Sequence, residues 1–129
     1  MKIEHKHQNE DTIQEQAIQT IRLLGVFCYH VANEGATSAR EGAFRKRRGV
    51  LSGVPDIVLH LPGGRTGFIE LKTETGKLRP GQVEFERRVK ELGCLHAVCR
   101  SVVEVKATVV GWIGQPSSGG YEIKTETRR

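Results

Sequence analysis

The stretch GVPDIVLHLPGGRTGFIELK, residues 53–72, decides the fold of this chain. Two apolar runs, Asp56–Leu61 and Thr66–Lys72, flank a turn-forming sequence at 62–65, Pro-Gly-Gly-Arg. Apolar runs of this length on either side of a glycine-rich turn predict two antiparallel strands joined as a hairpin. The hairpin then carries two carboxylates, Asp56 and Glu70, and the amine of Lys72.

The register of this hairpin decides whether its polar side chains meet. Alternate residues of a strand share a face, so Asp56 lies opposite the apolar side chains of its own strand. Glu70 and Lys72 likewise lie opposite the apolar side chains of theirs. A three-residue loop pairs Asp56 with Glu70, a five-residue loop pairs Asp56 with Lys72, and a four-residue loop separates them. We expect an odd-numbered loop, which places all three side chains on one face.

Two carboxylates facing each other across strands repel, so their proximity needs a physical reason. A divalent cation supplies one, because Mg²⁺ is bound by one or two carboxylates together with water and phosphate oxygens. Such an ion makes a bound water more acidic and neutralises charge on a phosphodiester. Lys72 could orient the attacking water or stabilise the transition state. A solvated Glu-X-Lys ion pair is the structural alternative. We interpret the three residues as the centre of a metal-dependent nuclease.

Length, charge and cysteine content agree with this interpretation without requiring it. The chain has 129 residues, enough for one domain with its own core. Its net charge of +5 favours polyanionic partners. The three cysteines (Cys28, Cys94 and Cys99) lie in apolar runs and are expected to be buried free thiols. No run is long enough to span a membrane, so we expect a soluble cytoplasmic protein without a membrane partner.

The remaining pattern predicts three helices and two further strands. The helices are Glu10–Leu24, one from Pro80 to Gly93 and one from Ser101 towards Ile113, and the strands are Val26–Ala32 and Leu95–Cys99. The polar stretch Asn33–Gly53 contains a basic segment, Ala39–Arg48, with no predicted element. This order indicates an α/β fold around one small mixed sheet flanked by helices. We expect one domain over residues 1–115 and a flexible tail over 116–129.

Three motifs resemble the VRR-NUC family of the PD-(D/E)XK nuclease superfamily: GVPD at 53–56, FIELK at 68–72 and GKLRPGQ at 76–82. The resemblance runs from Glu10 to about Ile113 and is to the stand-alone members of phages and bacteria. It implies a restriction-endonuclease-like core and an endonuclease that uses Mg²⁺ or Mn²⁺. It also implies that Asp56, Glu70 and the backbone carbonyl of Leu71 bind the metal, with Lys72 as the catalytic lysine. Family members imply a homodimer acting on branched DNA such as four-way junctions.

Two further residues are candidates for the same site. Superfamily members often carry an acidic residue on the first helix near the metal, and Glu10, on the same stripe as Ala17 and Ile21, is the candidate metal ligand there. A favourable charge at a helix N-terminus is the alternative for Glu10, and Glu15 is a competitor that points away from the stripe. Gln82 shares a helix face with apolar residues (Phe85, Val89 and Leu92) and matches the glutamine that follows the catalytic strand in the family. It could contact the attacking water or a phosphate, or bond locally within the first helical turn.

The basic residues are candidates for contacts with DNA phosphates. The set comprises Arg40, Arg45, Lys46, Arg47 and Arg48 in the basic segment, with Lys77 and Arg79 as weaker candidates. A solvated basic surface is the structural alternative. Two other functions also fit the sequence: a non-catalytic basic module that binds nucleic acid, and a sequence-specific, restriction-type nuclease.

Overall fold

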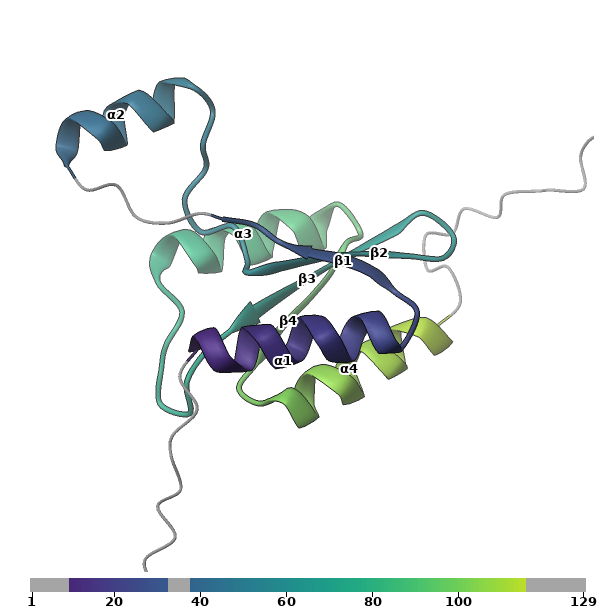
Figure 1. Cartoon of the computed structure of the whole chain (residues 1–129). Helices are drawn as coiled ribbons and strands as arrows, with labels where there is room; N and C mark the ends of the chain where they lie inside the picture. Colours follow the sequence, from purple (N-terminus) through teal and green to yellow (C-terminus); the bar gives the residue numbers. More distant parts are fainter. Residues whose placement is uncertain (1–9, 33–37, 116–129) are drawn as a thin grey trace, which may run out of the picture.

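The computed structural model describes residues 10–32 and 38–115, so the predicted tail at 116–129 lies outside the described residues. Helices and strands alternate along most of the chain (Figure 1). The elements are α1 (Glu10–Leu23), β1 (Phe27–His30), α2 (Ala39–Arg47), β2 (Ile57–Leu61), β3 (Arg65–Leu71), α3 (Pro80–Glu91), β4 (Leu95–Cys99) and α4 (Val102–Gly114). Within these residues, no helix combines the length and the apolar character that crossing a membrane requires.

The strands form one mixed sheet in the order β1-β2-β3-β4. β1 pairs antiparallel with β2 and β2 antiparallel with β3, whereas β3 and β4 are parallel. A parallel pair cannot be joined by a tight turn, and α3 supplies the crossover between β3 and β4. The predicted α/β fold around a small mixed sheet is confirmed.

Helices cover both faces of the sheet. α1 and α4 lie side by side on one face, and α3 lies on the other (Figure 1). The core fills the first interface and contains Ile13, Ala17 and Ile21 of α1, Ile57, Leu59, Ile69, Leu71 and Cys99 of the sheet, and Val105, Val109 and Trp112 of α4. On the second face, Phe68 of β3 meets Phe85 of α3 edge to face, with ring centroids 5.1 Å apart. The face opposite the main core is therefore the one that receives Glu70 and Lys72.

Most predicted elements agree with the structure, but α2 was not predicted. The segment at 39–47 has one large apolar side chain, Phe44, so it has no apolar periodicity to indicate a helix. Its capping signal was present, because the Ser38 hydroxyl accepts a hydrogen bond from the Glu41 N–H at 3.1 Å. The same spacing was recognised at Ser101, whose hydroxyl accepts from the Glu104 N–H at 3.2 Å.

Two details of the predicted amphipathic faces differ from the structure. Glu10 was expected on the core side of α1, but it is exposed at the first residue of the helix. Leu92 was placed on the apolar face of α3, yet it is 80% exposed because it forms the C-cap, where the helix has ended. Cys28 and Cys99 are buried free thiols as expected, and Cys94 is half-buried.

Candidate active site

The hairpin has the three-residue loop that brings its polar side chains together. Leu61 pairs with Arg65 and Ile57 with Ile69, which leaves residues 62–64 as the loop and confirms the odd-numbered expectation. Continuing this register by one residue places Asp56 opposite Glu70. Asp56 is held there because its Oδ2 accepts a hydrogen bond from the Leu71 N–H at 2.8 Å.

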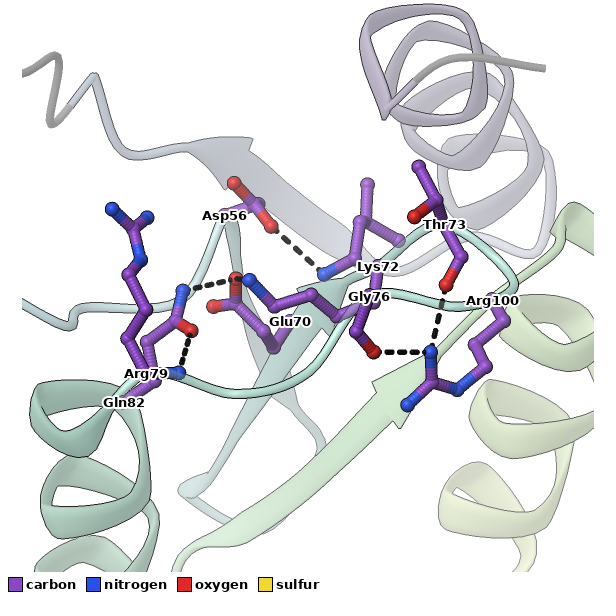
Figure 2. Close-up of polar contacts among 9 residues, drawn as sticks. Asp56, Glu70, Lys72, Thr73, Gly76, Arg79, Gln82 and Arg100 are labelled. Carbon is purple, nitrogen blue, oxygen red and sulfur yellow. Dashed lines mark hydrogen bonds and ion pairs between the residues drawn. The ribbon is translucent and has the colours of Figure 1, made fainter. Parts of the chain in front are cut away.

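Glu70 lies at the centre of the site and is only 4% exposed. Its Oε1 accepts a hydrogen bond from Gln82 Nε2 at 2.8 Å and lies 3.8 Å from Lys72 Nζ (Figure 2). Its other oxygen, Oε2, is buried and has no hydrogen-bond partner among the described residues. A buried carboxylate oxygen without a donor is costly unless something else binds it.

Burial raises the pKa of Glu70 from its ordinary value of 4.5 to about 8. The neighbouring charge of Asp56 adds to this rise, while the ammonium of Lys72 opposes it. Two carboxylates held close together in a desolvated site cannot both ionise easily. The site therefore favours a state in which one carboxyl group is protonated. When both carboxyl groups are ionised, the site needs a further positive charge.

Gln82 connects the first turn of α3 to Glu70. Its Oε1 accepts a hydrogen bond from the Arg79 N–H at 2.8 Å, which leaves its Nε2 free to donate to Glu70. The side chain is 6% exposed, as expected for an amide that satisfies its bonds within the protein. The local bonding expected within the helical turn occurs, and Gln82 also bonds to Glu70, whereas its contact with the attacking water or a phosphate stays a prediction.

Two glycines bring the segment before Asp56 against the start of α3. Gly53 has φ of +87°, and a Cβ built on it would lie 2.3 Å from the carbonyl oxygen of Gly81. No side chain fits between these two backbones. The GVPD and PGQ motifs therefore share a structural role, because their glycines let the two segments cross in contact.

We expect Gly53→Ala to destabilise the protein by about 2–5 kcal/mol, which combines a left-handed backbone penalty with a steric overlap. Gly49→Ala is a matched control, since Gly49 has φ of +92° but nothing within 4 Å of the built Cβ. The free energy of unfolding of the control should fall only by the backbone penalty of about 1–2 kcal/mol. Urea unfolding measures both, and equal losses would show that the contact with Gly81 is unimportant.

The donor atoms of the site suit a hard divalent cation. Asp56 and Glu70 provide carboxylate oxygens, one of them unpartnered, and the Leu71 carbonyl follows Glu70 in the chain. Oxygen donors of this kind are those that Mg²⁺ and Mn²⁺ prefer. In the described part of the chain, no three His, Cys, Asp or Glu side chains come together as a metal-binding group. Two carboxylates are compatible with Mg²⁺, which keeps waters and substrate oxygens among its ligands.

Glu10 lies within electrostatic range of this site. Although exposed, its negative charge contributes to the raised pKa of Glu70. Glu15, the competing residue of α1, is also exposed. The structure thus places the charge of Glu10 close enough to affect the pKa of Glu70.

The predicted DNA-contacting residues fall into two groups. Lys77 and Arg79 are exposed on the segment between β3 and α3, next to Gln82. The other group is on or next to α2, which stands apart from the sheet and the other helices (Figure 1). Within that group Arg45 bonds to Glu41 at 2.8 Å, Arg48 lies over the Phe44 ring, and Arg40, Lys46 and Arg47 are exposed.

One charged residue beside the site was not predicted from the sequence. Arg100, directly after β4, donates from Nη1 to the carbonyl oxygens of Thr73 and Gly76, each at 2.7 Å. No spacing or motif indicates this contact, because it joins segments that are far apart in the chain.

The structure has a mixed sheet with helices on both faces, and Asp56, Glu70 and Lys72 lie beside one another on it. This architecture fits the restriction-endonuclease-like fold. Residues 8–103 match the VRR-NUC domain, and the chain belongs to this family of nucleases. The resemblance noted in the three sequence motifs is confirmed.

Solved structures agree with this assignment. One described as "VRR_NUC domain" is 25% identical, with a TM-score of 0.59, and the match covers 80% of this chain and 96% of the other. Another, described as "VRR_NUC domain protein", is 22% identical with a TM-score of 0.68, and the match covers 84% of this chain and 90% of the other. The second likeness shows the fold alone. No curated protein matches the sequence.

Proposed function

We propose that this protein is a metal-dependent endonuclease that hydrolyses phosphodiester bonds of DNA. The observation that carries the proposal is the buried Glu70 carboxylate, which has one unpartnered oxygen and lies beside Asp56 and Lys72. Membership in the VRR-NUC family supports the same reaction. The three free cysteines agree with the reducing cytoplasm in which we place the enzyme.

The residues of the site have separate roles in this proposal. Asp56, Glu70 and the Leu71 carbonyl would hold Mg²⁺ or Mn²⁺, with Glu10 adding negative charge nearby. The bound cation supplies positive charge to the phosphodiester and makes water more acidic. Lys72, held 3.8 Å from Glu70, orients the attacking water or stabilises charge on the phosphate. Gln82 holds Glu70 in place through its amide hydrogen bond. The second hydrogen of the same amide nitrogen would be available to the attacking water or a phosphate.

The decisive experiment is a cleavage assay with Mg²⁺, Mn²⁺ or EDTA. The substrates are a four-way junction, a flap, a nicked duplex and a plain duplex of matched sequence. Cleavage that requires metal supports the proposal. DNA binding without cleavage under every condition supports a non-catalytic module instead. Cleavage that follows base sequence and ignores branching supports a restriction-type enzyme.

We further propose that the enzyme prefers branched DNA and acts as a homodimer. Exposed apolar side chains on and after α2 support the dimer: Phe44 is 50% exposed and Leu51 is 54% exposed. A short helix that stands apart from its own domain gains stability when a second copy covers it. A symmetric pair of sites would also suit paired cuts across a junction. Light scattering of the wild type and of Phe44→Asp tests the dimer, which the charge should weaken.

The basic residues of α2 should contribute to DNA affinity through phosphate contacts. Replacing Arg40, Lys46 and Arg47 by glutamine should weaken binding and lower the slope of log affinity against log salt by about 0.9 for each phosphate that is no longer neutralised. Lys106→Gln is the control, because Lys106 is exposed on α4. Fluorescence anisotropy at several salt concentrations measures both. An unchanged slope in the triple variant would show that these basic residues of α2 do not contact DNA phosphates.

A further inference from the structure

Arg100 holds the turn that follows the candidate catalytic strand. Its Nη1 donates to the carbonyl oxygens of Thr73 and Gly76 at 2.7 Å (Figure 2). It also donates to the carbonyl oxygen of Glu74 at 3.3 Å. The turn is also closed on itself, because the Gly76 N–H donates to the Thr73 carbonyl at 3.1 Å. One guanidinium therefore binds three carbonyl groups of a single turn, with the added strength of a charged donor.

This turn lies beside the side chain of Lys72. A Cβ built on Gly76 would lie 3.0 Å from Thr73 Oγ1 and 3.5 Å from Lys72 Cδ, so only about the width of a methyl group separates Gly76 from the lysine stem. The backbone of Lys72 is fixed from the same side, since its N–H donates to the Cys99 carbonyl at 3.0 Å. The position of the amine near Glu70 consequently depends on the position of the turn.

The other end of the same segment leads to Gln82. Residues 77–79 connect the turn to α3, and the Arg79 N–H is bonded to Gln82 Oε1. Gln82 in turn donates to Glu70. Lys72 and Gln82, whose side chains approach Glu70 Oε1, thus lie at the two ends of the segment that Arg100 binds.

We propose that Arg100 is a positioning residue, which fixes the segment at 73–79 so that the Lys72 amine and the Gln82 amide are both held against Glu70. The inference rests on the proposed nuclease function. Arg100 acts through main-chain carbonyls, and all of these bonds come from the single nitrogen Nη1.

The first test is a kinetic comparison of Arg100→Ala with Arg65→Ala. Arg65 is a matched control, since its Nη1 also donates to a main-chain carbonyl, that of Trp112 at 2.7 Å, but at a helix end remote from the turn. We expect Arg100→Ala to lower kcat about 10- to 100-fold, with a much smaller change in KM. Arg65→Ala should lose stability without a comparable loss of kcat. Guanidinium chloride should partly restore kcat in Arg100→Ala, whereas sodium chloride at equal ionic strength should not.

The second test does not require activity. Hydrogen exchange should show faster exchange of the Gly76 and Gln82 N–H groups in Arg100→Ala than in Arg65→Ala. Unchanged kcat and unchanged exchange in Arg100→Ala overturn the proposal, as does an equal loss of kcat in Arg65→Ala. If the wild type does not cleave DNA, the nuclease function fails, and exchange alone decides the role of Arg100. If Arg100→Ala does not fold, Arg100→Lys takes its place in both tests. We then expect a smaller loss of kcat than for alanine. Wild-type kcat together with wild-type exchange in Arg100→Lys would contradict the proposal.

Discussion

Asp56→Asn should lower the rate of DNA cleavage by more than about 100-fold, which is the upper end of what residues outside the metal shell cost. The substitution keeps an oxygen that can accept from the Leu71 N–H, so the hairpin should stay folded. It removes one of the two carboxylate charges that would hold the cation. DNA binding, measured by anisotropy in EDTA, should persist because the basic residues are untouched.

Matched variants separate the roles of the site residues. Asp11→Asn makes the same chemical change on the exposed first turn of α1 and should retain cleavage. Lys72→Met preserves the length of the buried lysine stem without its charge, and we expect a loss comparable to that of Asp56→Asn. Full activity in Asp56→Asn would exclude this carboxylate as a metal ligand.

Glu70 should make the metal-free protein less stable as the pH rises. Its folded pKa of about 8 exceeds the ordinary value of 4.5, so between these values the folded state holds a proton that the unfolded state has lost. The stability that this group contributes is complete below pH 4.5 and is lost as the pH rises through about 8. In thermal unfolding in EDTA, the melting temperature of Glu70→Gln relative to that of the wild type should therefore rise from pH 5 to pH 9.

Divalent metal should reverse this difference. A cation that binds the ionised carboxylates stabilises the folded state by mass action, and more strongly at high pH where Glu70 is deprotonated. Mg²⁺ should raise the melting temperature of the wild type at pH 8 and leave that of Glu70→Gln nearly unchanged. Parallel pH profiles for the two proteins, with or without metal, would contradict the raised pKa.

The comparison with Glu70→Gln also removes an opposing contribution. Burial lowers the pKa of His96, so the stability that this histidine contributes is lost as the pH falls, opposite in sign to the effect of Glu70. Because His96 is present in both proteins, it cancels from the difference. The remaining pH dependence belongs to Glu70 and the groups coupled to it.

The sequence predicted the part of the site that depends on local pattern. Alternation along two strands indicated which side chains share a face of each strand, and the expected odd-numbered loop then placed Asp56, Glu70 and Lys72 together. Gln82 was found because a polar residue on an apolar helix face needs a polar partner. These inferences use periodicity and hydrogen-bonding requirements, both of which can be judged within a short window of sequence.

The contacts that the sequence did not predict join distant segments. Arg100 binds carbonyls of residues 73–76, and the crossing of Gly53 with Gly81 joins the segment before β2 to the start of α3. Such contacts are created by the tertiary arrangement and have no local pattern. α2 was missed for a different reason, because a helix that stands apart from the core of its own domain carries no apolar periodicity.

Binding of Mn²⁺ in the absence of DNA, followed by electron paramagnetic resonance, tests the central claim most directly. The account predicts that the wild type binds Mn²⁺ in a site that Asp56→Asn and Glu70→Gln both weaken strongly. It also predicts that affinity rises with pH towards about 8, as Glu70 loses its proton. Equal Mn²⁺ binding by the wild type and both variants would show that these carboxylates do not hold the metal.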